Sequence, residues 1–204
     1  MRMNKLLVPL AFSMLFSSGV SAATDLTEAN FKEYLARLTP LAEQGDAESQ
    51  VGLGIMYSEG MGVLENDRTG AKWFTLAAKQ GNADAQYMLA VKFDKGEGVL
   101  ENNSMARQYA EDAAVQGHGD AQHFLAILNG LDKEYIRSYM WFILAVYNNA
   151  MGDATEAKES LEKVMERTDI AKAQEMASRC LESGYKDCGI LPVLEYDDVG
   201  EMAD

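Results

Sequence analysis

A segment of 36 residues occurs twice in succession in this chain, and that repeat limits its possible folds more than any single residue does. The run Gly-Asp-Ala-Glu-Ser-Gln at 45–50 returns as Gly-Asn-Ala-Asp-Ala-Gln at 81–86 and as Gly-His-Gly-Asp-Ala-Gln at 117–122. Residues 45–80 and 81–116 share 13 identities, mostly Gly, Ala, Leu, Asn and Gln rather than typical catalytic residues. A period of this length predicts a stacked array of supersecondary units.

Each unit is expected to form a helical hairpin. In the first unit, one helical face is predicted from the spacing of Ala47, Gln50, Leu53, Gly54 and Tyr57. Two close glycines, Gly60 and Gly62, then break the helix, and Asn66 or Asp67 caps the next one. The second helix presents Gly70, Trp73, Phe74, Ala77 and Ala78, and Gly81 ends it.

The second unit repeats this pattern at the same spacing. Small residues at 54/90, 70/106, 77/113 and 78/114 predict that neighbouring helix backbones approach closely. Aromatic residues at 57/93 and 73/109 are expected to fill the space between layers. Neither hairpin would bury both of its faces alone, so stacking stabilises the array.

The third unit begins in register at Gly117, but its loop is expected to be shorter. Trp141 lies four residues before position 145, where two repeats after Trp73 would place it. Two capping helices are predicted near 153–167 and 169–183, the second starting at Thr168 or Asp169. Their charged outer faces suit the end of an array; they carry Glu156, Lys158, Glu159, Glu162 and Lys163.

The remaining boundaries follow from the ends of the array. Residues 23–44 are predicted to form an entry cap around an amphipathic helix, with Phe31, Leu35, Leu38 and Leu41 facing inward and Pro40 as a possible kink. Repeats are expected at 45–80, 81–116 and 117–150, followed by C-terminal capping helices over 151–188. An acidic tail at 189–204 lacks helical rhythm and is expected to be flexible, with packing on the array as the alternative.

Residues 1–22 have the pattern of a secretory signal peptide. A basic start with Arg2 and Lys5 precedes an eleven-residue apolar stretch and then small residues before Ala23. Because a bilayer span needs about 20 apolar residues, an uncleaved anchor is the weaker alternative. No cysteine follows the apolar stretch, which argues against lipid attachment. We therefore expect a mature chain in the periplasm or outside the cell, with no stable membrane insertion.

The charge of the chain restricts its partners. The formal net charge is −14 at pH 7, and removal of the signal peptide would make it −16, because residues 1–22 contain two basic residues and no acids. Such a chain repels phosphate backbones and anionic membrane surfaces, so nucleic acid is not expected as a partner. Solubility alone accounts for the acidity, and attraction to a basic partner surface is the alternative.

Cys180 and Cys188 are the two cysteines of the chain. In an oxidising compartment, an even number at close spacing favours a disulfide, with two buried thiols as the alternative. The spacing matches neither a redox pair nor a zinc knuckle.

The repeat residues resemble the Sel1-like repeat family, which is related to tetratricopeptide repeats. The pattern over 47–81 carries Ala, Leu-Gly, Tyr, Gly-x-Gly-Val, Trp-Phe, Ala-Ala and Gly at the family's spacing, and 83–117 repeats it with four substitutions. Ser138–Ala145 and Thr168–Gln174 also look like parts of such proteins. The resemblance implies an all-α, right-handed α-solenoid of stacked hairpins with terminal capping helices.

The resemblance further implies an adaptor or scaffold that binds other proteins. We expect an unidentified protein or peptide to bind in the groove lined by the first helix of each repeat. Exposed candidates are Ser49, Met56, Tyr87 and Lys92. Alternatives are binding of an envelope polymer such as peptidoglycan, or an enzyme-associated role. The oligomeric state stays open.

Residues that could suggest chemistry have simpler explanations. Ser160 and Lys163 match a motif of β-lactam-recognising enzymes, but the two accompanying motifs are absent. His118 and His123 point to different sides of a helix and form no convincing metal set, so a helix cap at His118 and a packing or surface role for His123 are expected. We predict a non-enzyme without cofactor or metal.

Overall fold

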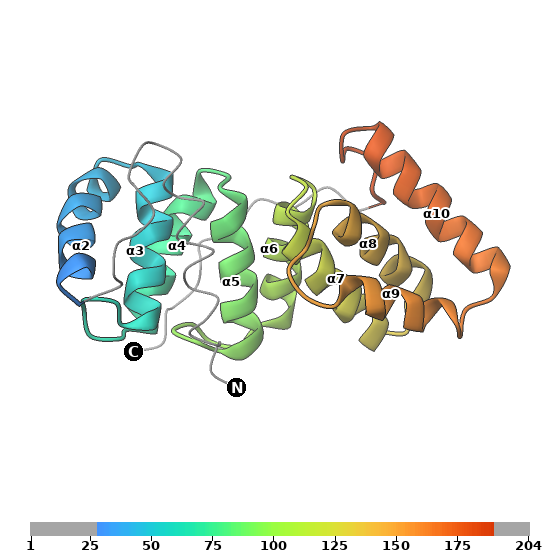
Figure 1. The fold of residues 1–204 in the computed structure, drawn as a ribbon, viewed down its shortest axis with the longest axis horizontal. Helices are drawn as coiled ribbons and strands as arrows, with labels where there is room; N and C mark the ends of the chain where they lie inside the picture. The colour runs from blue at the N-terminus through green and yellow to red at the C-terminus, as the bar shows by residue number, and fades with distance from the viewer. Residues whose placement is uncertain (1–27, 190–204) are drawn as a thin grey trace. The chain divides into compact units, whose positions relative to one another are not determined.

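The computed structural model describes residues 28–189 (Figure 1). These residues form two compact units divided after Gln80. All secondary structure in this range is helical. The predicted signal peptide lies outside the described residues, as does the predicted tail apart from Gly189. Among the described helices, none has the length and apolar content needed to cross a membrane.

The first unit contains α2 (Glu28–Glu43), α3 (Ala47–Glu59) and α4 (Asp67–Lys79). Helix α2 packs against α3, and α3 packs against α4. Pro40 lies within α2 without ending it. The inward face predicted for α2 is wrong at its C-terminal end: Leu41 is 48% exposed, whereas its neighbour Ala42 is 2% exposed.

Small residues bring α3 and α4 together, as predicted. A methyl group on Gly54 would lie 2.5 Å from the ring of Phe74, and one on Gly70 would lie 2.8 Å from the backbone oxygen of Gly54. Asn66 is the cap of α4, since its Oδ1 accepts the backbone N–H of Thr69 at 2.9 Å. Of the two residues considered for this cap, the structure selects Asn66.

The second unit begins with four helices that pack in sequence. These are α5 (Ala83–Lys95), α6 (Asn103–Ala114), α7 (Gly119–Leu131) and α8 (Tyr135–Tyr147). The aromatic pair predicted between layers is present, because the rings of Phe93 and Tyr109 stack with centroids 5.6 Å apart. The core of this unit is made of buried aromatic and aliphatic side chains, among them Leu89, Tyr109, Leu125, Tyr139 and Leu144.

The shortened third hairpin is confirmed. Seven residues, 60–66, separate α3 from α4, and seven, 96–102, separate α5 from α6. Three residues, 132–134, separate α7 from α8. The loss of four residues from this loop accounts for the early position of Trp141.

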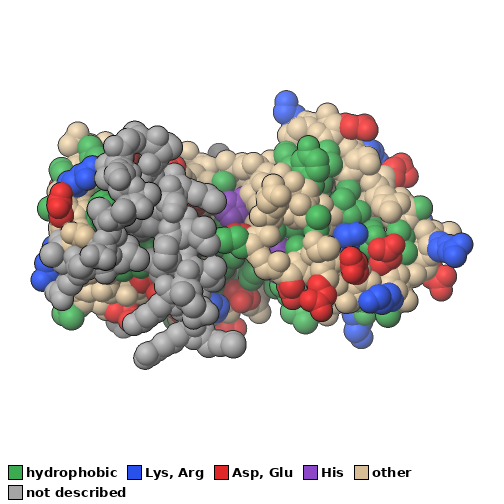
Figure 2. Space-filling model, viewed as in Figure 1, with side chains coloured by type: hydrophobic (Ala, Val, Ile, Leu, Met, Phe, Trp, Pro, Cys, Tyr) green, Lys and Arg blue, Asp and Glu red, His purple; other side chains and the backbone are tan. Residues whose placement is uncertain are grey.

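Two further helices, α9 (Ala154–Glu162) and α10 (Arg167–Glu182), pack against α8. The predicted cap of the last helix is wrong, because α10 starts at Arg167 and Thr168 and Asp169 lie within its first turn. Side chains of both charge signs lie over α9 and α10 in Figure 2, as the predicted solvent-facing surface requires.

Cys180 and Cys188 form a disulfide in the structure, with their Cα atoms 4.4 Å apart. The loop that it closes holds Tyr185 in a left-handed conformation, at φ 67°. The Tyr185 hydroxyl exchanges hydrogen bonds with the Asn148 side chain at 2.7 and 3.0 Å. These hydrogen bonds hold the disulfide loop against the C-terminal end of α8.

Candidate functional site

Side-chain amides connect the two helices of each hairpin. Gln80 donates to the Oε1 atom of Gln50 at 2.7 Å, and Gln116 donates to Gln86 at the same distance. In the third hairpin Asn148 donates to Gln122 at 2.8 Å. These amides support the fold. The pairing was not predicted from the sequence, although Gln80 and Gln116 are identical at the 36-residue offset.

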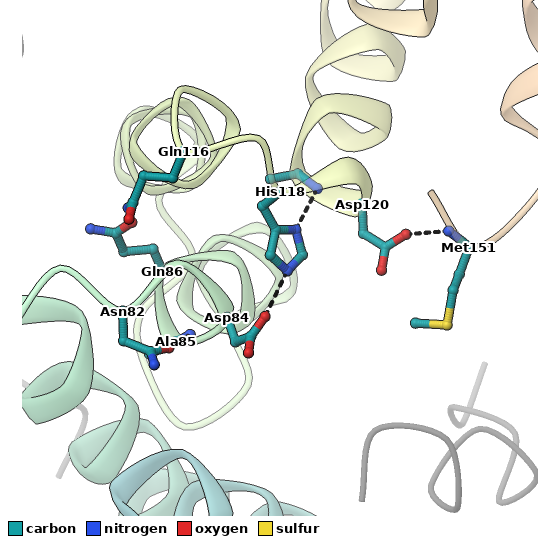
Figure 3. A network of polar contacts seen from close by, with 9 residues as sticks. Asn82, Asp84, Ala85, Gln86, Gln116, His118, Asp120 and Met151 are labelled. Atoms are coloured by element: carbon teal, nitrogen blue, oxygen red, sulfur yellow. Dashed lines mark hydrogen bonds and ion pairs between the residues drawn. The ribbon is translucent and has the colours of Figure 1, made fainter. Parts of the chain in front are cut away.

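His118 lies at the start of α7 and makes two different hydrogen bonds (Figure 3). Its Nδ1 atom accepts the backbone N–H of Ala121 at 3.1 Å, so the expectation of a helix cap is confirmed. Because Nδ1 is an acceptor, the neutral ring carries its proton on Nε2. Nε2 lies 3.0 Å from Oδ1 of Asp84 on α5 and donates to it.

Asp84 and Tyr87 respond electrostatically to these neighbours. The hydrogen bond from His118 lowers the pKa of Asp84, and the smaller effect of burial opposes it. Burial raises the pKa of Tyr87 to about 12, with a further contribution from the charge of Asp120. Both groups therefore keep one charge state, Asp84 ionised and Tyr87 neutral, through the physiological pH range.

The Tyr87 and His118 rings lie against each other, with centroids 4.9 Å apart and planes tilted by 31°. Asp120, on the first turn of α7, accepts the backbone N–H of Met151 (Figure 3). We call Asp84, Tyr87, His118 and Asp120 the first-helix cluster. It presents two carboxylates and two rings from α5 and α7.

His123 lies in the second turn of α7. Its Nε2 atom lies 3.4 Å from Oδ1 of Asp153 but forms no hydrogen bond within the described residues. The ring packs against Phe142, with centroids 5.7 Å apart. His123 is thus mainly a packing residue, in agreement with the prediction.

Comparison with known proteins identifies the repeat. The family model described as Sel1 repeat matches residues 47–82, 83–118 and 119–149, which together make up half of the chain. The chain belongs to the Sel1 repeat family. Sel1 repeat proteins are generally protein-interaction scaffolds.

Solved Sel1-type structures share the fold. A Sel1 repeat protein from Oxalobacter formigenes has a TM-score of 0.59 and 23% identity, over 76% of this chain and 73% of that one. The protective antigen c5321 of uropathogenic Escherichia coli strains, which displays an SLR fold, has a TM-score of 0.71 and 24% identity. That match covers 94% of this chain and 41% of the antigen. No curated protein gives a significant match. The likenesses confirm the all-α solenoid fold class predicted from the Sel1 pattern.

Three of the four residues proposed to be exposed are buried in the structure. Ser49 is 3% exposed, Met56 is fully buried and Lys92 is 6% exposed, so the expectation that they are exposed is wrong. Met56 and Lys92 occupy equivalent positions at the 36-residue offset, and Ser49 is equivalent to Ala85, which is also fully buried. Helical periodicity could not separate the face toward the neighbouring helices from the face toward solvent.

Tyr87 is half-buried and is the one member of that set that belongs to the first-helix cluster. Asp84 and Asp120 were not predicted as site residues. Their signal was present in the sequence, because positions 48, 84 and 120 are all acidic. In each Sel1 repeat this acid lies in the first turn of a helix, where it also favours the helix dipole.

Ser160 and Lys163 are both exposed on or beside α9. Neither side chain is enclosed, whereas a serine–lysine nucleophile pair works in a site shielded from water. Within residues 28–189, no group of three or more His, Cys, Asp or Glu side chains is arranged to hold a metal ion.

Proposed function

We propose that this Sel1 repeat protein is a non-enzymatic scaffold of the cell envelope that binds a protein or peptide on its first-helix surface. The observation that carries the proposal is the first-helix cluster. Tyr87 and His118 form a ring pair, Asp84 bonds to His118, and the charge of Asp120 acts on Tyr87. Neither ring is required by the repeat. The position of Tyr87 holds Val51 in the first repeat, and the cap position of His118 holds Asp46 and Asn82.

The envelope location rests on two independent features. Residues 1–22 have the pattern of a signal peptide, and Cys180 and Cys188 are paired in the structure. Disulfides persist in oxidising compartments and are rare in the cytosol. N-terminal sequencing of the protein recovered from the periplasm or medium should begin near Ala23.

The binding proposal is tested by affinity capture from an envelope extract, with variants chosen from the repeat register. His118→Asn keeps a residue that caps the equivalent helix in the second repeat, where Asn82 accepts the N–H of Ala85 at 2.9 Å. This variant should stay folded but lose the ring and its bond to Asp84. Tyr87→Ala removes the other ring.

Glu159→Gln is the matched control, because Glu159 is exposed on α9 and is not a member of the cluster. A defined protein that is retained by the control and lost with both cluster variants supports the proposal. A protein captured equally by all variants places the binding surface elsewhere.

The alternatives are separate outcomes of the same capture. Recovery of peptidoglycan fragments without protein would favour a polymer-binding or enzyme-associated role. Hydrolysis of a chromogenic β-lactam that disappears in Ser160→Ala would contradict the non-enzymatic assignment.

A further inference from the structure

A second feature of the second unit lies apart from the first-helix cluster. The C-terminal ends of α5 and α7 and the N-terminal part of α6 surround a surface hollow of about 480 Å³. Its lining consists of Asp94, Asn103, Ser104, Arg107, Leu128, Leu131 and Asp132. All of these residues belong to the same compact unit.

The charged groups of the hollow leave one negative charge uncompensated. Arg107 forms an ion pair with Asp132. The carboxylate of Asp94 makes no hydrogen bond or ion pair with any residue in the described part of the chain. Lys95 follows Asp94 on α5, but it does not line the hollow. Two carboxylates therefore face a single guanidinium.

Helix dipoles add to this negative potential. The hollow receives the C-terminal ends of α5 and α7, each carrying partial negative charge, and the N-terminal end of α6, which carries partial positive charge. Two negative ends and one positive end leave a negative balance. A cation is thus the complementary ligand.

The apolar part of the lining defines the shape of that cation. Leu128 is half-buried, whereas Leu131 is 75% exposed and offers its side chain to the solvent. A small ion would leave these leucines uncovered. Lysine and arginine combine a charged head with an aliphatic stem that covers apolar surface.

The repeat itself does not require this set of residues. At the 36-residue offset, Ser58, Arg68, Ala71 and Lys92 stand in place of Asp94, Ser104, Arg107 and Leu128. The other three lining residues also differ from their counterparts, which are Asp67, Lys95 and Gly96. The hollow is formed where the second repeat differs from the first and the third repeat differs from the second.

We propose that this hollow binds a lysine or arginine side chain of a partner protein, with the cationic head at Asp94 and the stem against Leu128 and Leu131. The site is separate from the first-helix cluster, and it does not depend on the function proposed for that surface. It would act as an anchor for one basic side chain of a partner.

The test is an NMR titration of the ¹⁵N-labelled full-length protein at constant ionic strength. The probes are the N-acetyl methylamides of lysine, arginine, norleucine and glutamate, together with methylammonium as a cation without a stem. Lysine and arginine probes should shift the amide signals of 103–107 and 128–132 in a saturable manner. Norleucine, glutamate and methylammonium should shift these signals at least threefold less at equal concentration.

Asp94→Asn should raise the dissociation constant of the lysine probe about threefold, as expected for the loss of one partly exposed ion pair. Leu131→Ala should raise it about twofold by removing contact with the stem. The control Glu159→Gln removes a negative charge outside the hollow and should leave the constant unchanged.

Three results would overturn the proposal: equal shifts with norleucine, a stronger response to glutamate, or an unchanged constant in Asp94→Asn. Thermal unfolding of each variant, followed by circular dichroism, verifies that it is folded. Since the titration uses no envelope partner, its outcome is independent of the capture experiment on the first-helix cluster.

Discussion

The contact between Gly54 and Phe74 leads to a quantitative prediction about the repeat. A methyl group at Gly54 would lie 2.5 to 2.9 Å from three atoms of the Phe74 ring, which is 1% exposed. The second repeat has Ala90 and Ala110 at these two positions, and both are fully buried. At this contact the first repeat pairs a glycine with an aromatic ring, whereas the second repeat pairs two alanine methyl groups.

Gly54→Ala should therefore destabilise the protein despite the better helix propensity of alanine. Overpacking a core lowers the free energy of unfolding by about 1 to 3 kcal/mol, and the higher helix propensity of alanine offsets about 1 kcal/mol of this loss. Because the enclosed ring has little room to move, we expect a net loss of about 1.5 kcal/mol. Phe74→Ala alone should cost about 3 to 5 kcal/mol.

The double variant reproduces the pairing of the second repeat and should be less damaged than the sum of its parts. Without the ring, the new methyl group no longer clashes and fills part of the cavity. We expect a favourable coupling of about 2 kcal/mol, within the range seen for residues in contact.

Urea unfolding followed by far-ultraviolet circular dichroism gives the four free energies of unfolding for this cycle. Gly52→Ala is the matched control in the same helix, since its methyl group would meet only a terminal carbon of the half-buried Leu38 side chain, at 2.9 Å. It should change stability by less than 1 kcal/mol. Additivity of Gly54→Ala and Phe74→Ala within about 0.5 kcal/mol would refute the proposed steric origin.

Three further predictions concern the second unit. Gln116→Ala should lower the free energy of unfolding by about 1 kcal/mol in urea titrations, because Gln86 loses its hydrogen-bond donor. An unchanged free energy of unfolding would show that the hydrogen bond between Gln116 and Gln86 does not stabilise the protein. Thiol labelling of the unreduced, denatured protein should modify neither Cys180 nor Cys188, and two labelled thiols would exclude the disulfide. Cys188→Ser should lower the free energy of unfolding by about 2.5 kcal/mol in the loop-entropy model. Burial raises the pKa of Asp112 from 3.8 to about 6, so the folded state binds more protons than the unfolded state between these values and stability falls as pH rises through that window. Asp112→Asn should relieve this loss by about 1 kcal/mol at pH 7 relative to pH 4.5, allowing for the half-exposed position of the carboxyl group; equal pH dependence in both proteins would contradict the assignment.

Much of the fold could be read from residues that recur every 36 positions. The close approach at Gly54 and Gly70 and the shorter third loop were predictable, because each depends on interactions within one hairpin. The cap of α4 was narrowed to Asn66 or Asp67, and the structure selects Asn66. The start of α10 was not predictable, since Thr168 and Asp169 are good caps locally but the helix begins two residues earlier.

The candidate sites, like the fold, could be predicted only in part from the sequence. The acidic series at 48, 84 and 120 could be read directly, but the partners of those carboxylates could not. Asp84 meets His118 across 34 residues, and Asp120 meets Met151 across 31 residues. The hollow also depends on packing, because Asp94, Arg107 and Leu131 come from three different helices.

The sequence by itself determined the helical repeat, its period and its Sel1 family, because capping, helix breaking and small-residue spacing are local properties of the chain. Only the tertiary structure decided which side of each first helix faces solvent. It buried Ser49, Met56 and Lys92 and left Tyr87 only half-buried beside His118. The physical reason is that a helix in a stack has neighbours on several sides. The spacing of its residues therefore shows which of them share a face, but not whether a neighbouring helix or solvent covers that face.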